Sequence, residues 1–298
     1  MRRLAVVLLL LGGLQISSSA KEGKGVSVDL DAGLELLGVA QLISGSSSVP
    51  HGFGPLDAQY IRVVQDRFSP YRRHFGVTFN AELDAKAFDY MQRAETILRR
   101  ASYPDFGEKH FIPDMLIQNI GGKTRFDRWV DGLRDFGREA RFDEFFKEQQ
   151  VKLEPVLAAS REAVNRADFI GKIERYAGLP FNGRYKILVS PFVIPGSLVN
   201  TVVPLDDGGY DIVSVFGPRG PLSEGLDVGK DAISATAWHE LSHGILDNLG
   251  DLYRDEIARS EPLYGQLSWP CYNQWLQCVK EHVVRAVMIR LIAKNESE

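Results

Sequence analysis

The pattern of apolar residues changes near residue 178, and this change constrains the fold more than any other feature of the chain. Before it, apolar residues recur at the three- and four-residue spacing of amphipathic helices, over 57–75, 81–101 and 125–177. After it, short segments rich in Val, Ile and aromatic residues indicate strands over 185–193, 198–203 and 210–216. Helical patterns return over 233–249 and 275–293. Helices, then a small sheet, then helices predict an α+β fold.

Proline and glycine predict where some of these helices stop. Pro155 is expected to interrupt the helical run before residue 178, because proline removes a backbone donor. Gly250 is expected to end the helix that begins near Ile233, since glycine commonly follows a helix C-terminus. Near the start of the chain, the pattern predicts a strand over 26–30 and a helix over 33–43.

The first twenty residues have the order of a secretory signal peptide. Arg2 and Arg3 are basic, residues 4–14 are apolar, and 18–20 are small residues suited to cleavage. The apolar run is shorter than the roughly 20 residues of a membrane-spanning helix, so we expect no stable membrane insertion after cleavage. We therefore expect a secreted or periplasmic protein that begins at Lys21. The expected divisions are a signal peptide over 1–20, a mainly helical N-terminal region over 21–177 and a core over 178–298.

Charge and cysteine content restrict partners and covalent links. The formal net charge of −4 argues against a nucleic-acid partner, because phosphate-binding surfaces are usually basic. The two cysteines are Cys271 and Cys278. In one helix they would lie about 10.5 Å apart, beyond the roughly 7 Å limit for a disulfide. A bond therefore requires Cys271 to lie outside regular helix, and two buried thiols are the equally weighted alternative.

Residues 239–243 read His-Glu-Leu-Ser-His within the predicted helix 233–249. Positions i and i+4 lie on one face of a helix, so His239 and His243 can bind one metal ion. Glu240 points away from the ligand position but reaches a water activated by zinc, whose proton it can accept. The motif therefore predicts a zinc site with Glu240 as catalytic base. The opposing interpretation is a solvated helix face with two ordinary histidines.

The rest of this helix fits an amphipathic element beside a cleft. Its expected apolar face holds Trp238, Leu241, Ile245, Leu249 and Leu252. Asp247 lies one turn after His243 and is placed to orient a ligand imidazole.

A catalytic zinc site needs a third protein ligand. The metzincin extension of the motif fails, because Leu246 and Leu249 occupy the positions of its Gly and His. A carboxylate from a later helix is the alternative. The candidates are Asp251, Asp255, Glu256, Glu261 and Glu281. Glu281 is favoured because it lies in a largely apolar helix, where an uncompensated carboxylate is costly. An ion pair with Arg285 is the structural alternative for Glu281.

The stretch HELSHGILD (239–247) is similar to the motif helix of thermolysin-type gluzincins. The mature chain also resembles a bacterial family of exported HExxH proteins that is known only as a domain of unknown function. Five stretches carry that resemblance: GLELLGVAQL, YIRVV…FSPYRRHF, KILVSPF, HELSH and EHVVRA. It implies a zincin-like core, zinc, peptidase-like chemistry and Glu281 as third ligand. The chain departs from it in having Gly244-Ile245-Leu246 after the second His.

These observations combine into an expected function, which is zinc-dependent hydrolysis of a peptide or protein substrate with Glu240 as general base. Tyr272 is the favoured phenol for stabilising the oxyanion. The segment 210–216 is expected to be an edge strand that pairs with extended peptide. Two alternatives remain: an exported zinc-binding protein that cleaves nothing, and a zinc amidase or esterase.

Overall fold

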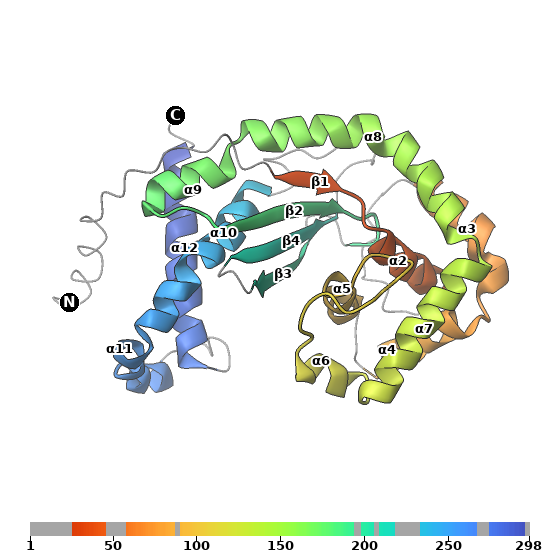
Figure 1. Cartoon of the computed structure of the whole chain (residues 1–298), viewed down its shortest axis with the longest axis horizontal. Helices are drawn as coiled ribbons and strands as arrows, with labels where there is room; N and C mark the ends of the chain where they lie inside the picture. Colours follow the sequence, from red (N-terminus) through yellow and green to blue (C-terminus); the bar gives the residue numbers. More distant parts are fainter. Residues whose placement is uncertain are drawn as a thin grey trace.

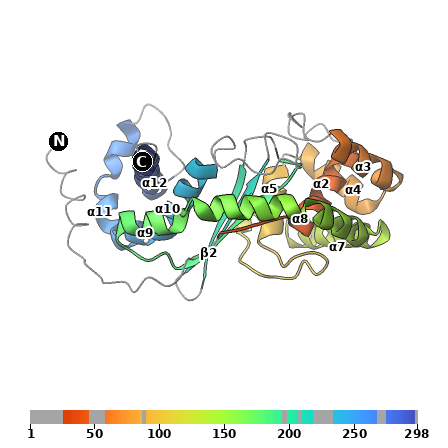
Figure 2. The ribbon, with the colours of Figure 1, turned by 90° about the horizontal axis from the view of Figure 1, so that it is seen from above.

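The computed structural model describes residues 26–45, 58–86, 90–193, 198–205, 209–217, 233–266 and 274–295. Its fold is α+β, as predicted, with a small sheet between two groups of helices (Figure 1). Helices α2 to α7, which cover residues 32–139, lie toward one end of the sheet, and α9 (Phe169–Ala177), α10 (Ile233–Leu252) and α12 (Trp275–Asn295) lie toward the other. The view from above shows α8 (Phe142–Arg166) running along the molecule between the two groups (Figure 2).

The sheet joins residues from distant parts of the chain. Its strands are β1 (Ser27–Asp29), β2 (Gly183–Val189), β3 (Leu198–Pro204) and β4 (Tyr210–Phe216). The strand order is β1-β2-β4-β3, with β1, β2 and β4 parallel and β3 antiparallel to β4. Ser27 pairs with Lys186, so the predicted N-terminal region supplies one strand of the sheet. The division into two regions at residue 178 stays a prediction.

The expected position of 210–216 at the edge of the sheet is wrong. β4 pairs with β2 on one side and with β3 on the other, and every residue of β4 is buried. A strand bonded on both sides has no free row of backbone groups to offer a peptide. Among the described strands, β3 occupies that edge.

The opposite edge of the sheet, at β1, is closed by side chains of α8 (Phe142–Arg166). Arg161 Nε donates to the carbonyl of Val28 at 2.8 Å. Asn165 accepts from the Val26 N–H at 2.8 Å and donates to the Val26 carbonyl at 3.1 Å. These bonds satisfy backbone groups that an edge strand would otherwise present to solvent.

Helix α8 also continues through Pro155, which the sequence predicted as a break. The proline ring removes the hydrogen bond that residue 155 would donate to the carbonyl of Val151. Val151 and Pro155 are both exposed in this part of α8, so water can satisfy the carbonyl. The helix is flanked by α7 (Lys123–Glu139) and α9 (Phe169–Ala177).

The N-terminal helices are shorter than the periodicity predicted. The expected helix 57–75 divides into α3 (Ala58–Phe68) and a 3₁₀ turn at Ser69–Tyr71 that carries Pro70. His74 then caps α4 by accepting from the Gly76 N–H at 3.1 Å. The elements of this group are α2 (Ala32–Ser44), α4 (Phe75–Ala85), α5 (Tyr90–Leu98) and α6 (Asp114–Asn119).

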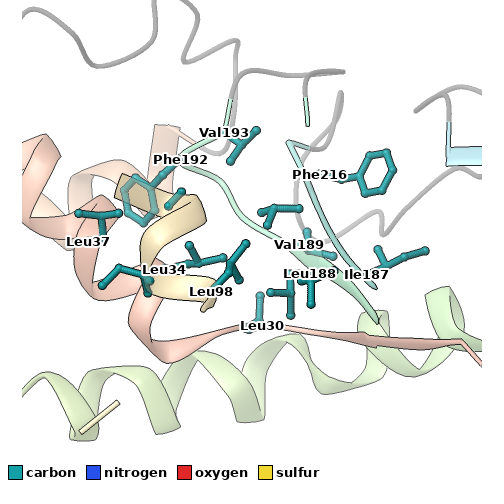
Figure 3. Packing of buried hydrophobic residues seen from close by; sticks show 14 of the residues in the cluster. Leu30, Leu34, Leu37, Leu98, Ile187, Leu188, Val189, Phe192, Val193 and Phe216 are labelled. Carbon is teal, nitrogen blue, oxygen red and sulfur yellow. The ribbon is translucent and has the colours of Figure 1, made fainter. Parts of the chain in front are cut away.

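One hydrophobic core connects these helices to the sheet. Figure 3 shows Leu34 of α2 and Leu98 of α5 close to Leu188 of β2, and Leu37 of α2 beside Phe192. β2 stops at Val189, earlier than predicted, because the chain turns after Ser190, whose carbonyl accepts from the Val193 N–H at 3.4 Å. No helix among the described residues is both long enough and apolar enough to span a membrane.

The C-terminal part contains the motif helix. α10 spans Ile233–Leu252 and α12 spans Trp275–Asn295, with α11 (Arg254–Ala258) and a 3₁₀ segment (Glu261–Gln266) between them. α10 passes through Gly250 instead of ending there, which shows that glycine alone does not stop a helix packed against a neighbour. Leu252, expected in the apolar face, is exposed at the end of α10.

Candidate metal centre

The motif helix is held against the molecule by its apolar face. Trp238 and Leu241 are buried, and the Trp238 ring packs edge-on against Phe169 of α9 at 4.8 Å between centroids. Gly244 lies where the helix meets the sheet. A Cβ there would lie 2.8 Å from the Phe181 ring and 3.1 Å from Ile212. A larger residue after the second histidine would therefore push α10 from the sheet and move the polar face with it.

The polar face of α10 and one residue of α12 bring three side chains together. His239 Nε2 and His243 Nε2 lie 3.2 Å apart. Glu281 Oε1 is 3.2 Å from His243 Nε2, and Glu281 Oε2 is 3.6 Å from His239 Nε2. One ligand atom from each residue can be chosen so that all three lie within 4.8 Å of one another. The predicted trio thus converges on one point.

The geometry of this trio fits a metal ion such as zinc. Ligand atoms about 2.0–2.1 Å from a tetrahedral zinc ion are separated by about 3.3 Å. The separations of 3.2 Å between the two imidazole nitrogens, 3.2 Å from His243 Nε2 to Glu281 Oε1 and 3.6 Å from His239 Nε2 to Glu281 Oε2 lie close to that value. With a single oxygen of Glu281, all three ligand atoms lie within 4.8 Å of one another. Two imidazoles and one carboxylate also form a donor set that catalytic zinc sites use. These residues therefore fit a zinc ion that leaves one coordination position for water or substrate.

Asp247 orients the second histidine. Its Oδ1 lies 3.1 Å from His243 Nδ1, so this nitrogen donates its proton to Asp247 and Nε2 is the atom at which a metal ion would replace the second ring proton. Burial opposes a charge on His243, but its bonds to Asp247 and Glu281 outweigh this and raise its pKa to about 10. Burial, and then the neighbouring His243, lower the pKa of His239. The carboxylates thus make this point strongly attractive to positive charge.

Glu240 is buried near the trio but is not one of the three residues whose ligand atoms converge. Burial raises its pKa to about 7, with the negative charges of Glu281 and Asp247 adding to the increase and His243 opposing it. Burial raises the pKa of Tyr185, a residue of β2 whose hydroxyl donates to Ser214 Oγ at 3.2 Å, and the nearby Glu240 charge adds a smaller increase. Sequence reasoning missed Tyr185. The alternation along β2, which places it on the face toward α10, is the signal that could have found it.

The remaining predicted residues fall into two groups. Asp255, Glu256 and Glu261 are exposed, as expected for surface charge. Tyr272 and Cys271 lie outside the described residues, as does the predicted signal peptide. Cys278 is disulfide-bonded, and α12 begins at Trp275, after the position of Cys271 in the chain. The bond is therefore compatible with the limit set by helix geometry.

Comparisons with known proteins identify a family but no activity. No curated protein and no solved structure matches the chain. Residues 107–298, more than half of the chain, match the family described as Domain of unknown function (DUF4932). The matched segment includes KILVSPF, HELSH and EHVVRA, whereas GLELLGVAQL and the 60–75 stretch precede it. The chain therefore belongs to this family of unknown function.

Proposed function

We propose that this protein is a zinc-dependent hydrolase of peptide bonds, with His239, His243 and Glu281 as the metal ligands and Glu240 as general base. The convergence of these three ligand atoms from α10 and α12 is the observation that carries the proposal. A zincin-like arrangement of the core, in the sense of the gluzincins, is part of it. The contact of Asp247 to His243 Nδ1 supports a metal site, since ligand histidines usually bond a carboxylate through their other nitrogen.

The protein's own groups supply the proton transfers. Zinc bound by the trio would polarise the scissile carbonyl and lower the pKa of water toward neutrality. Glu240 would take a proton from that water and pass it to the departing amine. A pKa of about 7 suits both steps near neutral pH, because a general base works best when its pKa is close to the working pH.

The edge strand β3 is the candidate for binding an extended peptide, in place of β4. β3 contacts α10, and the described residues place no strand on its outer side. A peptide added there would pair with β3 through main-chain hydrogen bonds, which give affinity without strong sequence preference. We also propose that the protein acts outside the cytoplasm, on the basis of the signal-like order of residues 1–20.

Metal analysis of the purified protein, combined with a peptide-library cleavage assay, tests this function. Glu240→Gln should keep about one zinc per chain and the fold, but lose on the order of 10²-fold or more in turnover, because the amide cannot accept a proton. Glu256→Gln, at an exposed position of α11, is the matched control and should leave turnover unchanged.

The same assays separate the alternatives. Stoichiometric zinc without cleavage of any peptide would favour a binding protein. Cleavage of amide or ester substrates but not of peptides would favour an amidase or esterase that uses the same residues. Turnover of Glu240→Gln at the parental rate would exclude Glu240 as the base.

A further inference from the structure

The residues of the metal centre are not equally accessible. The side chains of His243 and Glu281 are each 9% exposed, whereas that of His239 is 21% exposed. Arg285, one turn after Glu281 on α12, has a side chain that is 55% exposed. The centre is therefore closed around His243 and open around His239 and Arg285. A substrate that reaches the trio from solvent arrives on the side that carries the guanidinium.

Arg285 lies on the His239 side of the Glu281 carboxylate. Its Nε is 3.8 Å from Glu281 Oε2, the same oxygen that lies 3.6 Å from His239 Nε2. This shared oxygen places the cation at the edge of the trio and not elsewhere along the exposed face of α12.

We propose that the Arg285 guanidinium binds the carbonyl oxygen of the substrate and stabilises the negative charge that develops on it. This proposal rests on the hydrolytic function proposed above. When the water oxygen bonds to the carbonyl carbon, the π pair moves onto the carbonyl oxygen and Glu240 receives one water proton. When the carbon–nitrogen bond breaks, that pair re-forms the carbonyl and the amine leaves with the proton from Glu240.

The chemistry of a guanidinium suits this role. It has five N–H donors in a plane, so it can stay near Glu281 through Nε while its other nitrogens donate to a second acceptor. Donors aimed at a developing oxyanion contribute on the order of 10²–10³-fold to turnover. A free C-terminal carboxylate is the other anion that Arg285 could meet. The C-terminal carboxylate lies about 3.3–3.6 Å farther from the scissile carbonyl for each residue between them. Because Arg285 adjoins a ligand at the reacting centre, the scissile carbonyl oxygen is the favoured acceptor.

The test compares Arg285→Met and Arg285→Lys with Arg290→Met, a control at an exposed position of the same helix. Arg285→Met should lower kcat by about 10²–10³-fold with little change in KM. It should weaken binding of a phosphinic peptide, which mimics the tetrahedral centre, by a similar factor. Zinc affinity and the thermal midpoint should stay close to parental. Arg285→Lys should recover part of the loss, and Arg290→Met should behave as the parent.

Several outcomes would overturn the proposal. A parallel loss of zinc affinity would show that Arg285 only positions Glu281. A rise in KM confined to peptides with a free C-terminus, compared with amidated ones, would assign Arg285 to carboxylate recognition. If Tyr272→Phe abolished phosphinate binding while Arg285→Met did not, the tyrosine would hold that role.

Failure of the hydrolytic function can be told apart from failure of this inference. If the zinc-loaded parent cleaves nothing, the proposed function fails, but phosphinate binding still reports on Arg285. Equal affinity of the parent and Arg285→Met for the phosphinate would then overturn the contact. A weaker affinity in the variant would support it independently of turnover.

Discussion

The molecule buries carboxylates in two regions and compensates them in different ways. In the N-terminal helices, the side chain of Asp84 is 3% exposed and that of its ion-pair partner Arg93 is fully buried. Gln41 Nε2 also donates to Asp84 Oδ2 at 2.7 Å, and Arg93 Nη1 donates to the Asn80 carbonyl at 3.0 Å. In the C-terminal helices, Glu281 is nearly as buried but faces two imidazoles and a half-exposed arginine.

The difference teaches how to separate a structural acid from a ligand. Asp84 has its cation built into the chain, in a fixed position and surrounded by further donors. Glu281 instead shares its neighbourhood with Asp247, and the two acids raise the pKa of His243 between them. The first arrangement is complete without any ion. The second attracts a positive charge at its centre, where the chain supplies a protonated histidine and, at the exposed side, Arg285.

The largest expected effect comes from removing Glu281 from the trio. Glu281→Ala should lower zinc affinity by more than the 10–100-fold typical of losing a residue that only bonds to a ligand, because the ligand itself is removed. It should also abolish activity. Arg285→Ala should leave zinc affinity close to that of the parent, because Arg285 is not a ligand. Competition titration with a chelator of known affinity measures both variants, and equal zinc affinity of Glu281→Ala and the parent would contradict the assignment.

Breaking the ion pair of Asp84 and Arg93 should lower stability and leave zinc affinity unchanged. Arg93→Met leaves the Asp84 carboxylate buried without its guanidinium, which we expect to cost about 3–5 kcal/mol of stability. Zinc affinity of the folded fraction should be unchanged, since the substitution does not touch the trio. Urea denaturation followed by circular dichroism gives the stability change. A loss of zinc from protein that remains folded would show that the two regions are coupled.

A third buried acid, Glu35, bonds to hydroxyl groups instead of a cation among the described residues, and it should make stability depend on pH. Glu35 of α2 accepts from the Tyr60 hydroxyl at 2.5 Å and from Ser190 Oγ at 3.2 Å, and burial raises its pKa to about 8. The folded chain then keeps a proton that the unfolded chain releases above its ordinary value of 4.5. Stability should therefore fall as pH rises from about 4.5 to 8, by at most about 1.4 kcal/mol per pH unit.

Glu35→Gln is the matched variant for this dependence. The amide keeps the size and polarity of the protonated acid but cannot ionise, so the contribution of residue 35 to the slope should vanish. Denaturation midpoints measured at several pH values between 5 and 8 compare the two proteins. An identical pH dependence in both would show that Glu35 is not the source.

The smallest effect concerns the orientation of His243. Asp247→Ala removes the carboxylate that holds Nδ1, and zinc affinity should fall by about 10–100-fold, less than for Glu281→Ala. Asp247→Asn should lose less, because the amide oxygen still accepts from the ring. The chelator competition used for Glu281 ranks the three variants. A larger loss for Asp247→Ala than for Glu281→Ala would reverse the proposed roles.

Local patterns predicted what depends on local chemistry. The strands β3 and β4 lie where Val, Ile and aromatic residues gather, and the HELSH spacing placed both histidines on one face of α10. The apolar residues around Glu281 predicted a buried carboxylate, and its side chain is 9% exposed beside His243 and Arg285. Its role as a metal ligand stays a prediction, which rests on the cost of burying a charge.

Local sequence patterns could not predict features that depend on contacts between distant parts of the chain. The position of β4 inside the sheet follows from β3 folding back against it, which its own residues do not encode. Helix α8 passes Pro155 because that turn faces solvent, and a periodicity pattern does not report exposure. The pairing of Arg93 with Asp84 needs the relative placement of α4 and α5.

The closure of β1 by Arg161 and Asn165 has a consequence for self-association. A sheet with two open edges can add a copy of itself on each side and so grow without limit. Here α8 blocks one side, and among the described strands only β3 remains to be matched by a strand of another molecule. Two copies joined edge to edge through β3 would leave no further edge to continue from. Assembly by this route therefore ends at a closed pair and does not lead to a fibre.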